Sequence, residues 1–202
     1  MRLVAEKLAG ERGGETLFSN LDFTVAAGEA LLVTGPNGAG KSTLLRIIAG
    51  LLARSAGSLR VVEGSENLDE VAQLAHYLGH LNAMKPVLSI EENLEFWRAF
   101  NGAGKRSVIA ALDKVGLGDI AHLPFGYLST GQKRRASIAR LLVSDRPLWL
   151  LDEPTAGLDK ASELQFAGLM QEHLGNGGIV IAATHLPLGL EVAGELRLGA
   201  PA

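Results

Sequence analysis

The chain has 202 residues, a formal net charge of -3 from 19 basic and 22 acidic side chains, and no cysteine. The lack of cysteine excludes disulfides, cysteine-based zinc sites and thiol catalysis, and the lack of a basic excess argues against nucleic acid as a partner. Hydrophobic residues make up 47% of the chain, which suits a single packed domain over 1–202. The first residues soon become charged and no run of about 18 apolar residues occurs, so we expect neither a secretory leader nor a membrane span.

Hydrophobic patterning predicts strands that alternate with helices. Strands are expected at 3–8, 17–25, 30–34, 58–62, 75–78, 147–151, 179–183 and 196–198. Helices are expected at 42–52, 89–100, 107–115, 129–142 and 160–174. This alternation is typical of an α/β fold with a mostly parallel sheet, into which a helical insert enters at roughly 86–146. Ligands of such sheets bind at the carboxyl ends of the strands.

A glycine-rich loop follows the buried strand at 30–34 and opens a helix. It fits the pattern G-x-x-x-x-G-K-[ST] through Gly35, Pro36, Asn37, Gly38, Ala39, Gly40, Lys41 and Ser42, with Thr43 next. Small residues let backbone N–H groups wrap a phosphate, and the helix N-terminus adds positive potential. Lys41 would contact the β- and γ-phosphates, and the Ser42 hydroxyl would bind Mg²⁺. The alternative is a plain glycine-rich turn, but the strand–loop–helix context favours a nucleoside triphosphate site.

Two adjacent acids, Asp152 and Glu153, end the apolar strand at 147–151. Asp152 can hold Mg²⁺, directly or through water. Glu153 can face the γ-phosphate and polarise an attacking water. A solvated turn is the alternative, which the phosphate loop makes less attractive.

A five-residue motif resembles the signature of ABC-transporter ATPases, usually Leu-Ser-Gly-Gly-Gln. It consists of Leu128, Ser129, Thr130, Gly131 and Gln132, with Thr130 at the variable third position. The same residues form a capping box at the start of a helix, and both interpretations hold together because a capped helix N-terminus suits a γ-phosphate contact.

The order of the motifs completes the resemblance, which covers essentially the whole chain. Asp159, in Gly-Leu-Asp, resembles the D-loop, and His185 matches the H-loop histidine, although alone it would be an incidental strand-end histidine. The family implies the ABC ATPase fold of P-loop NTPases, with an N-terminal antiparallel β portion and a helical signature subdomain. It also implies a homodimer that sandwiches two ATP molecules with Mg²⁺, in which Glu153 is the catalytic base and His185 contacts the γ-phosphate.

Two positions depart from the family pattern. His80 stands where most members carry a glutamine, and a neutral imidazole can hold a metal or a water; the alternative is a loop histidine without a role. Arg12 falls near the usual adenine-stacking aromatic residue, and its guanidinium plane can stack on a base; the alternative is an exposed loop arginine.

Several stretches, including Tyr77-Leu78-Gly79-His80 and Gln132-Lys133-Arg134-Arg135, are similar to the ATPase subunits of cytochrome c maturation systems. That resemblance implies integral membrane subunits of the CcmB and CcmC type, a location on the cytoplasmic face of the bacterial inner membrane, and release of a haem-loaded chaperone, CcmE. We expect no haem bound by this chain, because His76, His122 and His173 have no ligand-like spacing.

Three alternatives stay open at this point. The first is the ATPase of another exporter, for drugs, lipids or peptides, and the identity of the membrane partner would decide this. The second is a soluble ABC ATPase that acts on DNA or ribosomes, which the chain length and the charge disfavour. The third is a small-molecule P-loop kinase, which would not need the signature motif.

Overall fold

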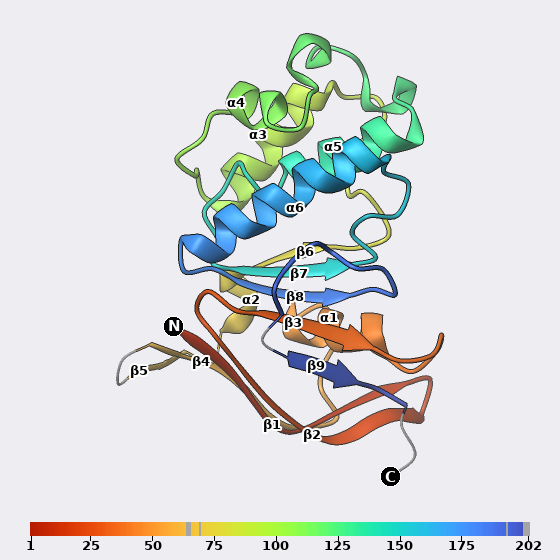
Figure 1. The fold of residues 1–202 in the computed structure, drawn as a ribbon, viewed down its shortest axis with the longest axis vertical. Helices are drawn as coiled ribbons and strands as arrows, with labels where there is room; N and C mark the ends of the chain where they lie inside the picture. The colour runs from red at the N-terminus through yellow and green to blue at the C-terminus, as the bar shows by residue number, and fades with distance from the viewer. Residues whose placement is uncertain (64–65, 69, 193, 200–202) are drawn as a thin grey trace. The chain divides into compact units, whose positions relative to one another are not determined.

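The computed structural model describes residues 1–63, 66–68, 70–192 and 194–199 (Figure 1). Its strands are β1 (Arg2–Arg12), β2 (Glu15–Ala26), β3 (Ala30–Thr34), β4 (Ala56–Glu63), β5 (Glu66–Leu68), β6 (Ala75–Leu78), β7 (Leu148–Asp152), β8 (Ile179–Ala183) and β9 (Gly194–Arg197). Its helices are α1 (Lys41–Ile48), α2 (Val71–Leu74), α3 (Ile90–Asn101), α4 (Val108–Asp113), α5 (Thr130–Ala139) and α6 (Lys160–Gly175), with short 3-10 helices η1 (Gly118–Ile120) and η2 (Phe125–Tyr127).

The chain divides into two compact units. The sheet unit comprises Met1–Gly79, Arg146–Pro154 and Met170–Ala202, and the helical unit comprises His80–Asp145 and Thr155–Leu169. The helical unit thus begins before the predicted insert at 86–146 and takes in the first part of α6. A single functional domain over 1–202 stays a prediction.

The larger sheet of the sheet unit is parallel throughout, with strand order β6-β7-β8-β3-β9. Every residue of β7 and β8 is buried, as expected for apolar strands covered on both faces. Since parallel strands end at the same edge, the segments after β3, β6, β7 and β8 share that edge. The predicted α/β fold with a mostly parallel core sheet is confirmed.

The second sheet is antiparallel, with order β2-β1-β4-β5, and confirms the predicted N-terminal antiparallel portion. β1 and β2 form a hairpin whose turn, Gly13 and Gly14, has positive φ angles of 62° and 83°. The first strand was expected to stop at Leu8 but runs to Arg12, because register shifts absorb irregular residues such as Lys7, whose φ is 48°.

Helix α1 packs between the two sheets of this unit and carries the site. Leu44, Leu45 and Ile48 of α1 share one buried cluster with Leu3 of β1 and Leu150 of β7. Burying each such side chain contributes about 1.5–3 kcal/mol, so the position of α1 is strongly determined. The predicted helix through Leu52 was wrong: α1 ends at Ile48, and Gly50 follows with a φ of 70°.

The helical unit is built from helices with well-defined starts. Ser89 caps α3 and Ser129 caps α5, each through a complete capping box, and Ser107 caps α4. Each serine oxygen accepts a hydrogen bond from a backbone N–H that the first turn would otherwise leave unpaired. The side chain of Ser129 accepts the Gln132 N–H at 3.2 Å, and Gln132 Oε1 accepts the Ser129 N–H at 2.9 Å.

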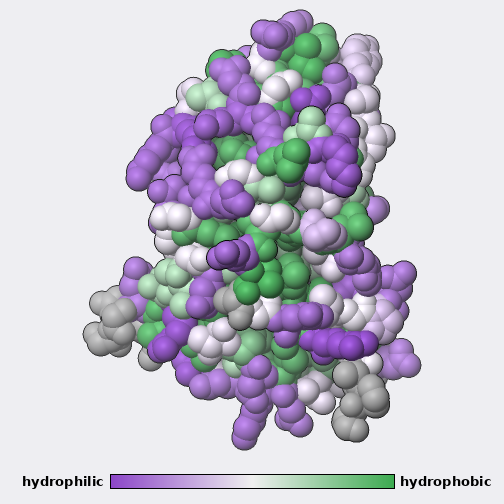
Figure 2. Space-filling model, in the orientation of Figure 1, coloured by the Kyte–Doolittle hydropathy of each residue, from purple (hydrophilic) through white to green (hydrophobic). Residues whose placement is uncertain are grey.

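Both hydrophobic and hydrophilic residues lie on the face drawn in Figure 2. Several large apolar side chains of the helical unit are exposed, including Leu81, Val87, Phe96, Phe100 and Tyr127. Within the part of the chain that the structure describes, none of the helices has the length and apolar character needed to cross a bilayer.

Candidate nucleotide-binding site

The loop between β3 and α1 adopts a conformation that depends on glycine. Gly35, Gly38 and Gly40 have φ angles of 131°, 86° and 95°, a region that other residues enter only with strain. A Cβ on Gly35 would lie 2.2 Å from the Leu198 carbonyl oxygen, and one on Gly40 would lie 3.0 Å from Leu17 Cβ. All three glycines therefore serve the backbone conformation, and Gly35 and Gly40 also permit close packing.

Lys41, the first residue of α1, turns its side chain back over this loop. Its ammonium donates hydrogen bonds to the Gly35 carbonyl oxygen at 2.7 Å and to the Pro36 carbonyl oxygen at 3.0 Å. The loop thereby holds a positive charge among its small residues.

The N-terminus of α1 differs from those of α3 and α5 because no side chain caps it. Gly40 is its N-cap residue, without a side-chain hydrogen bond, and the first turn contains no acidic residue. The partial positive charge of the helix end is therefore not neutralised locally, which favours an anion at this position.

The Asp152 carboxylate is held by residues from two other elements. Ser42 Oγ of α1 donates to Asp152 Oδ1 at 3.0 Å, and the Tyr77 hydroxyl of β6 donates to Asp152 Oδ2 at 3.1 Å. Arg46 Nε in turn donates to the Tyr77 hydroxyl at 3.3 Å. Only 6% of Asp152 is exposed, so this charge depends on such partners.

Glu153 follows Asp152 in a strained backbone conformation. Its φ is 44°, a region rarely used by residues other than glycine, asparagine and aspartate. Its N–H donates to the Ala183 carbonyl oxygen at 2.8 Å, which extends the pairing of β7 with β8 by one residue. The strained turn ends the strand and leaves the Glu153 side chain on the wall of a cavity.

The cavity has a volume of about 250 Å³ and brings together most of the predicted residues of the sheet unit. It is lined by Arg12, Leu17, Asn37, Gly38, Gly40, Lys41, Ser42, Thr43, Asp152 and Glu153. The phosphate loop, the two acids and Arg12 were expected together, and the structure places them together. Arg12 arrives there on the β1–β2 hairpin, beside Leu17.

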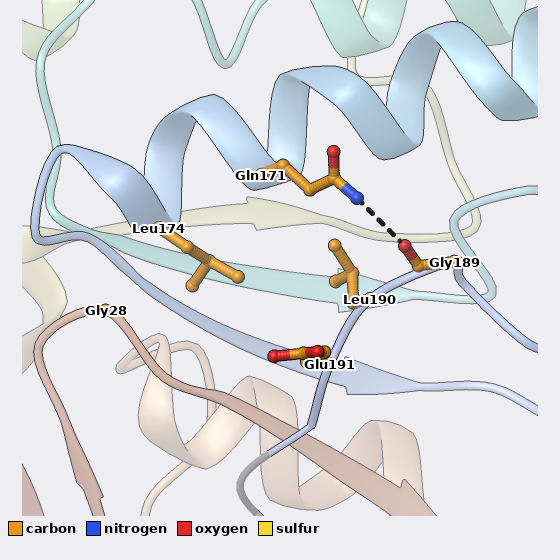
Figure 3. Close-up of a pocket in the computed structure, with 6 residues that line it drawn as sticks. All are labelled: Gly28, Gln171, Leu174, Gly189, Leu190 and Glu191. Atoms are coloured by element: carbon orange, nitrogen blue, oxygen red, sulfur yellow. Dashed lines mark hydrogen bonds between the residues drawn. The ribbon is translucent and has the colours of Figure 1, made fainter.

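A second cavity, of about 610 Å³, lies elsewhere in the sheet unit (Figure 3). Gln171 and Leu174 of α6, Gly28, and the segment Gly189–Glu191 line it, and Gln171 Nε2 donates to the Gly189 carbonyl oxygen at 3.1 Å. None of the residues predicted from the sequence lines this cavity.

The residues of the signature and of the D-loop lie in the helical unit, where they approach each other. A Cβ on Gly131 would lie 3.3 Å from the Gly157 carbonyl oxygen, and a Cβ on Gly157 would lie 3.4 Å from the methyl group of Thr130. Asp159 Oδ1 accepts the Ser162 N–H at 2.8 Å at the start of α6, and this hydrogen bond lowers the pKa of Asp159. Leu128, the first residue of the motif, is buried.

Two predicted histidines do not line the cavity. His185 is exposed directly after the buried Thr184, whose hydroxyl accepts the Leu186 N–H at 3.0 Å. His80 is also exposed, two residues after β6. His185 follows β8 of the parallel sheet, whereas His80 is the first residue of the helical unit.

The residues present fit a magnesium ion bound together with a nucleotide. The Ser42 hydroxyl and the Asp152 carboxylate are hard oxygen donors, and Mg²⁺ is usually held by one or two such groups plus phosphate oxygens and water. Among the described residues, no group of three or more His, Cys, Asp or Glu side chains gathers around one point. A site that needs phosphate to complete its ligands agrees with this donor set.

Sequence reasoning missed Tyr77 and Arg46 as contributors to this site. Arg46 lies four residues after Ser42 and so shares its face of α1, which is a signal that the sequence contains. Tyr77 lies at the carboxyl end of β6, but its approach to Asp152 depends on the pairing of β6 with β7. That pairing joins residues about 75 positions apart, so the sequence around Tyr77 contains no local signal of the contact.

The sequence and the fold of this chain are similar to those of known proteins. The model of the ABC transporter family matches residues 18–156. A cytochrome c biogenesis ATP-binding export protein CcmA from Mesorhizobium japonicum is 65% identical over 199 residues, with 98% of each chain covered. An ABC transporter ATP-binding protein structure from Pyrococcus furiosus has a TM-score of 0.82 at 23% identity, with 98% of each chain covered. An ATP-binding cassette solved as a dimer with ADP and phosphate has a TM-score of 0.78 at 24% identity, covering 91% of this chain and 88% of the other.

Proposed function

Because the chain belongs to the ABC transporter ATP-binding family and, within it, to the cytochrome c biogenesis ATP-binding export proteins, we propose that it hydrolyses ATP for a transporter that serves cytochrome c biogenesis. The observation that carries the chemistry is the hydrogen bond between Ser42 and Asp152 at the mouth of the phosphate loop. It joins the helix that binds phosphate to the strand that delivers the two acids. The strain at Glu153 supports a catalytic role for that residue.

In the sheet unit, each residue of the cavity has a distinct task. The backbone of Gly35–Gly40 and the end of α1 surround the phosphates, and Lys41 and Thr43 add polar contacts. Ser42 and Asp152 would hold Mg²⁺, whose positive charge would neutralise phosphate charge. Glu153 orients the attacking water and accepts its proton.

Three further residues complete the nucleotide contacts. His185 contacts the γ-phosphate, and His80 takes the place of the glutamine found in most family members. Arg12 stacks on the base, and its position on the cavity wall supports this assignment.

In the helical unit, the signature motif contacts the ATP of a second copy in a head-to-tail homodimer. Ser129 Oγ already accepts the Gln132 N–H, so its own proton remains to be donated to a phosphate oxygen. Gly131 leaves the helix end open to close approach, with Leu128, Thr130 and Gln132 holding the motif in place. Asp159 orders the start of α6 beside it.

The stretch 81–85 is the expected docking site for an integral membrane subunit of the CcmB or CcmC type. Trp97 Nε1 donates to the Ala83 carbonyl oxygen at 2.8 Å, and Asn93 Oδ1 accepts the Lys85 N–H at 2.7 Å, so α3 holds this stretch in place. Leu81 within it is 82% exposed. An ordered apolar residue facing solvent suits a protein partner, which would hold the chain at the cytoplasmic face of the inner membrane.

The biochemical test separates binding from hydrolysis. Wild type, Lys41→Ala and Glu153→Gln are compared for ATP binding and for release of phosphate with MgATP. We expect wild type to do both, Lys41→Ala to lose both, and Glu153→Gln to bind ATP while hydrolysis falls by at least about a hundredfold. Sedimentation of Glu153→Gln with MgATP should show a dimer, whereas normal hydrolysis by Lys41→Ala would contradict the assignment.

A further inference from the structure

Hydrogen bonds connect the Asp152 carboxylate with three other side chains, and the four residues come from three elements. Ser42 and Arg46 come from α1, Tyr77 comes from β6, and Asp152 ends β7. Each hydrogen bond of the set joins two different elements. The set therefore links the phosphate-binding helix to two neighbouring strands at the edge that carries the site.

The chemistry of these groups fixes the direction of every hydrogen bond. The Arg46 guanidinium only donates, so the Tyr77 oxygen accepts from it and points its own proton elsewhere. An ionised Asp152 only accepts, so it receives the Tyr77 proton on Oδ2 and the Ser42 proton on Oδ1.

The position of the Tyr77 ring depends on a glycine two residues further along. A Cβ on Gly79 would lie 2.6 Å from Tyr77 Cε1 and 3.0 Å from its hydroxyl oxygen. Real Cβ atoms do not approach ring atoms so closely, so any larger residue at position 79 would displace the ring. Gly79 therefore gives the ring the space from which its hydroxyl reaches Asp152.

We propose that Tyr77 is a positioning residue that holds the Asp152 carboxylate in the orientation required to bind the divalent cation of MgATP. Tyr77 engages Oδ2, which turns Oδ1 toward Ser42 on the phosphate loop's helix. With its proton donated to Asp152, the Ser42 hydroxyl would have its oxygen lone pairs available for a divalent cation. The proposal rests on the proposed function, because it concerns the same ATP site.

Removing the Tyr77 hydroxyl should lower the affinity for the divalent cation and leave the affinity for the nucleotide alone unchanged. Groups that hold a metal ligand in place usually account for about tenfold to a hundredfold in metal affinity. The Lys41 ammonium is held by the Gly35 and Pro36 carbonyl oxygens of the phosphate loop, so binding of free ATP should be retained when the Tyr77 hydroxyl is removed.

The test uses the full chain with Glu153→Gln as a background that does not hydrolyse ATP. Binding of methylanthraniloyl-labelled ATP is measured in EDTA and during titration with Mg²⁺. Tyr77→Phe keeps the ring and its packing, and Gly79→Ala displaces the ring. Tyr127→Phe is the matched control, because it removes the hydroxyl of the only other tyrosine in the sequence, which is 84% exposed.

We expect Tyr77→Phe and Gly79→Ala to raise the Mg²⁺ concentration at half-saturation at least about tenfold. Affinity in EDTA should stay within about twofold, and Tyr127→Phe should match the parent. An unchanged Mg²⁺ midpoint in Tyr77→Phe, or an equal loss of affinity in EDTA and in Mg²⁺, would overturn the positioning role while the ATP site stands. A parent protein that binds no labelled ATP under either condition would overturn the proposed function and this inference with it.

Discussion

Two glycines of the phosphate loop offer a matched pair of substitutions with different expected effects. Gly35→Ala and Gly38→Ala both place a side chain on a residue with positive φ, 131° and 86°. A Cβ at Gly38 would meet nothing within 4 Å, whereas one at Gly35 would lie 2.2 Å from the Leu198 carbonyl oxygen. The Leu198 N–H donates to the Thr34 carbonyl oxygen at 2.9 Å, so this part of the backbone is tied to β3 and does not retreat easily.

The magnitudes follow from these contacts. Gly38→Ala should cost only the left-handed backbone, about 1–2 kcal/mol of the free energy of unfolding. Gly35→Ala should add an overpacking cost of about 1–3 kcal/mol, for a total of about 2–5 kcal/mol. For a chain of this length, each kcal/mol lowers the melting temperature by about 2–4 °C.

Thermal and urea unfolding of the two variants, followed by circular dichroism, measure this difference directly. We expect Gly35→Ala to be clearly the less stable of the two, with an unchanged urea slope. Equal destabilisation of the two variants, or a larger effect in Gly38→Ala, would refute the argument from the Leu198 contact.

Three other predictions concern the helices and the surface. Ser129→Ala and Ser89→Ala should each lower helical-unit stability by about 1 kcal/mol through loss of an N-cap, but only Ser129→Ala should also abolish ATP hydrolysis; equal hydrolysis in both would argue against the signature role. Burial lowers the pKa of His173, which stacks on Trp149 at 4.0 Å between ring centroids, so its stabilising contribution is complete above its ordinary pKa of 6.5 and declines as pH falls toward the lowered value. His173→Gln should therefore show a smaller loss of urea midpoint between about pH 8 and about pH 5.5 than wild type, and an identical loss would contradict this. Replacing residues 81–85 with polar residues should leave ATP binding intact while abolishing cytochrome c maturation. Loss of ATP binding in these variants would argue against a docking role.

The strands of the core sheet could be predicted closely because their signal is local. β3 and β8 have the predicted bounds, since continuous apolar runs flanked by glycine mark strands that are buried on both faces. Element ends that depend on distant partners could not be predicted in this way. β1 continues past Leu8 because β2 and β4 pair with it, and β5 and α2 were not predicted at all.

The residues of the site also differ in whether a local sequence signal predicts them. The phosphate loop, Asp152 and Glu153 were predicted together because each follows a recognisable strand and parallel strands share an edge. Arg12 lines the cavity, and its contact with the base stays a prediction, whereas His185 and His80 are exposed and do not line it. The hydrogen bond of Tyr77 to Asp152 joins elements that only the folded sheet brings together.

The link between ATP hydrolysis by this chain and cytochrome c biogenesis can be tested directly. The most direct measurement is a stain for covalent haem in membrane proteins of a strain that lacks the chain, complemented with wild type or with Lys41→Ala at equal expression. We predict that wild type restores haem-stained c-type cytochromes and that Lys41→Ala does not. Normal haem staining in the strain without the chain, or full restoration by Lys41→Ala, would contradict the claim.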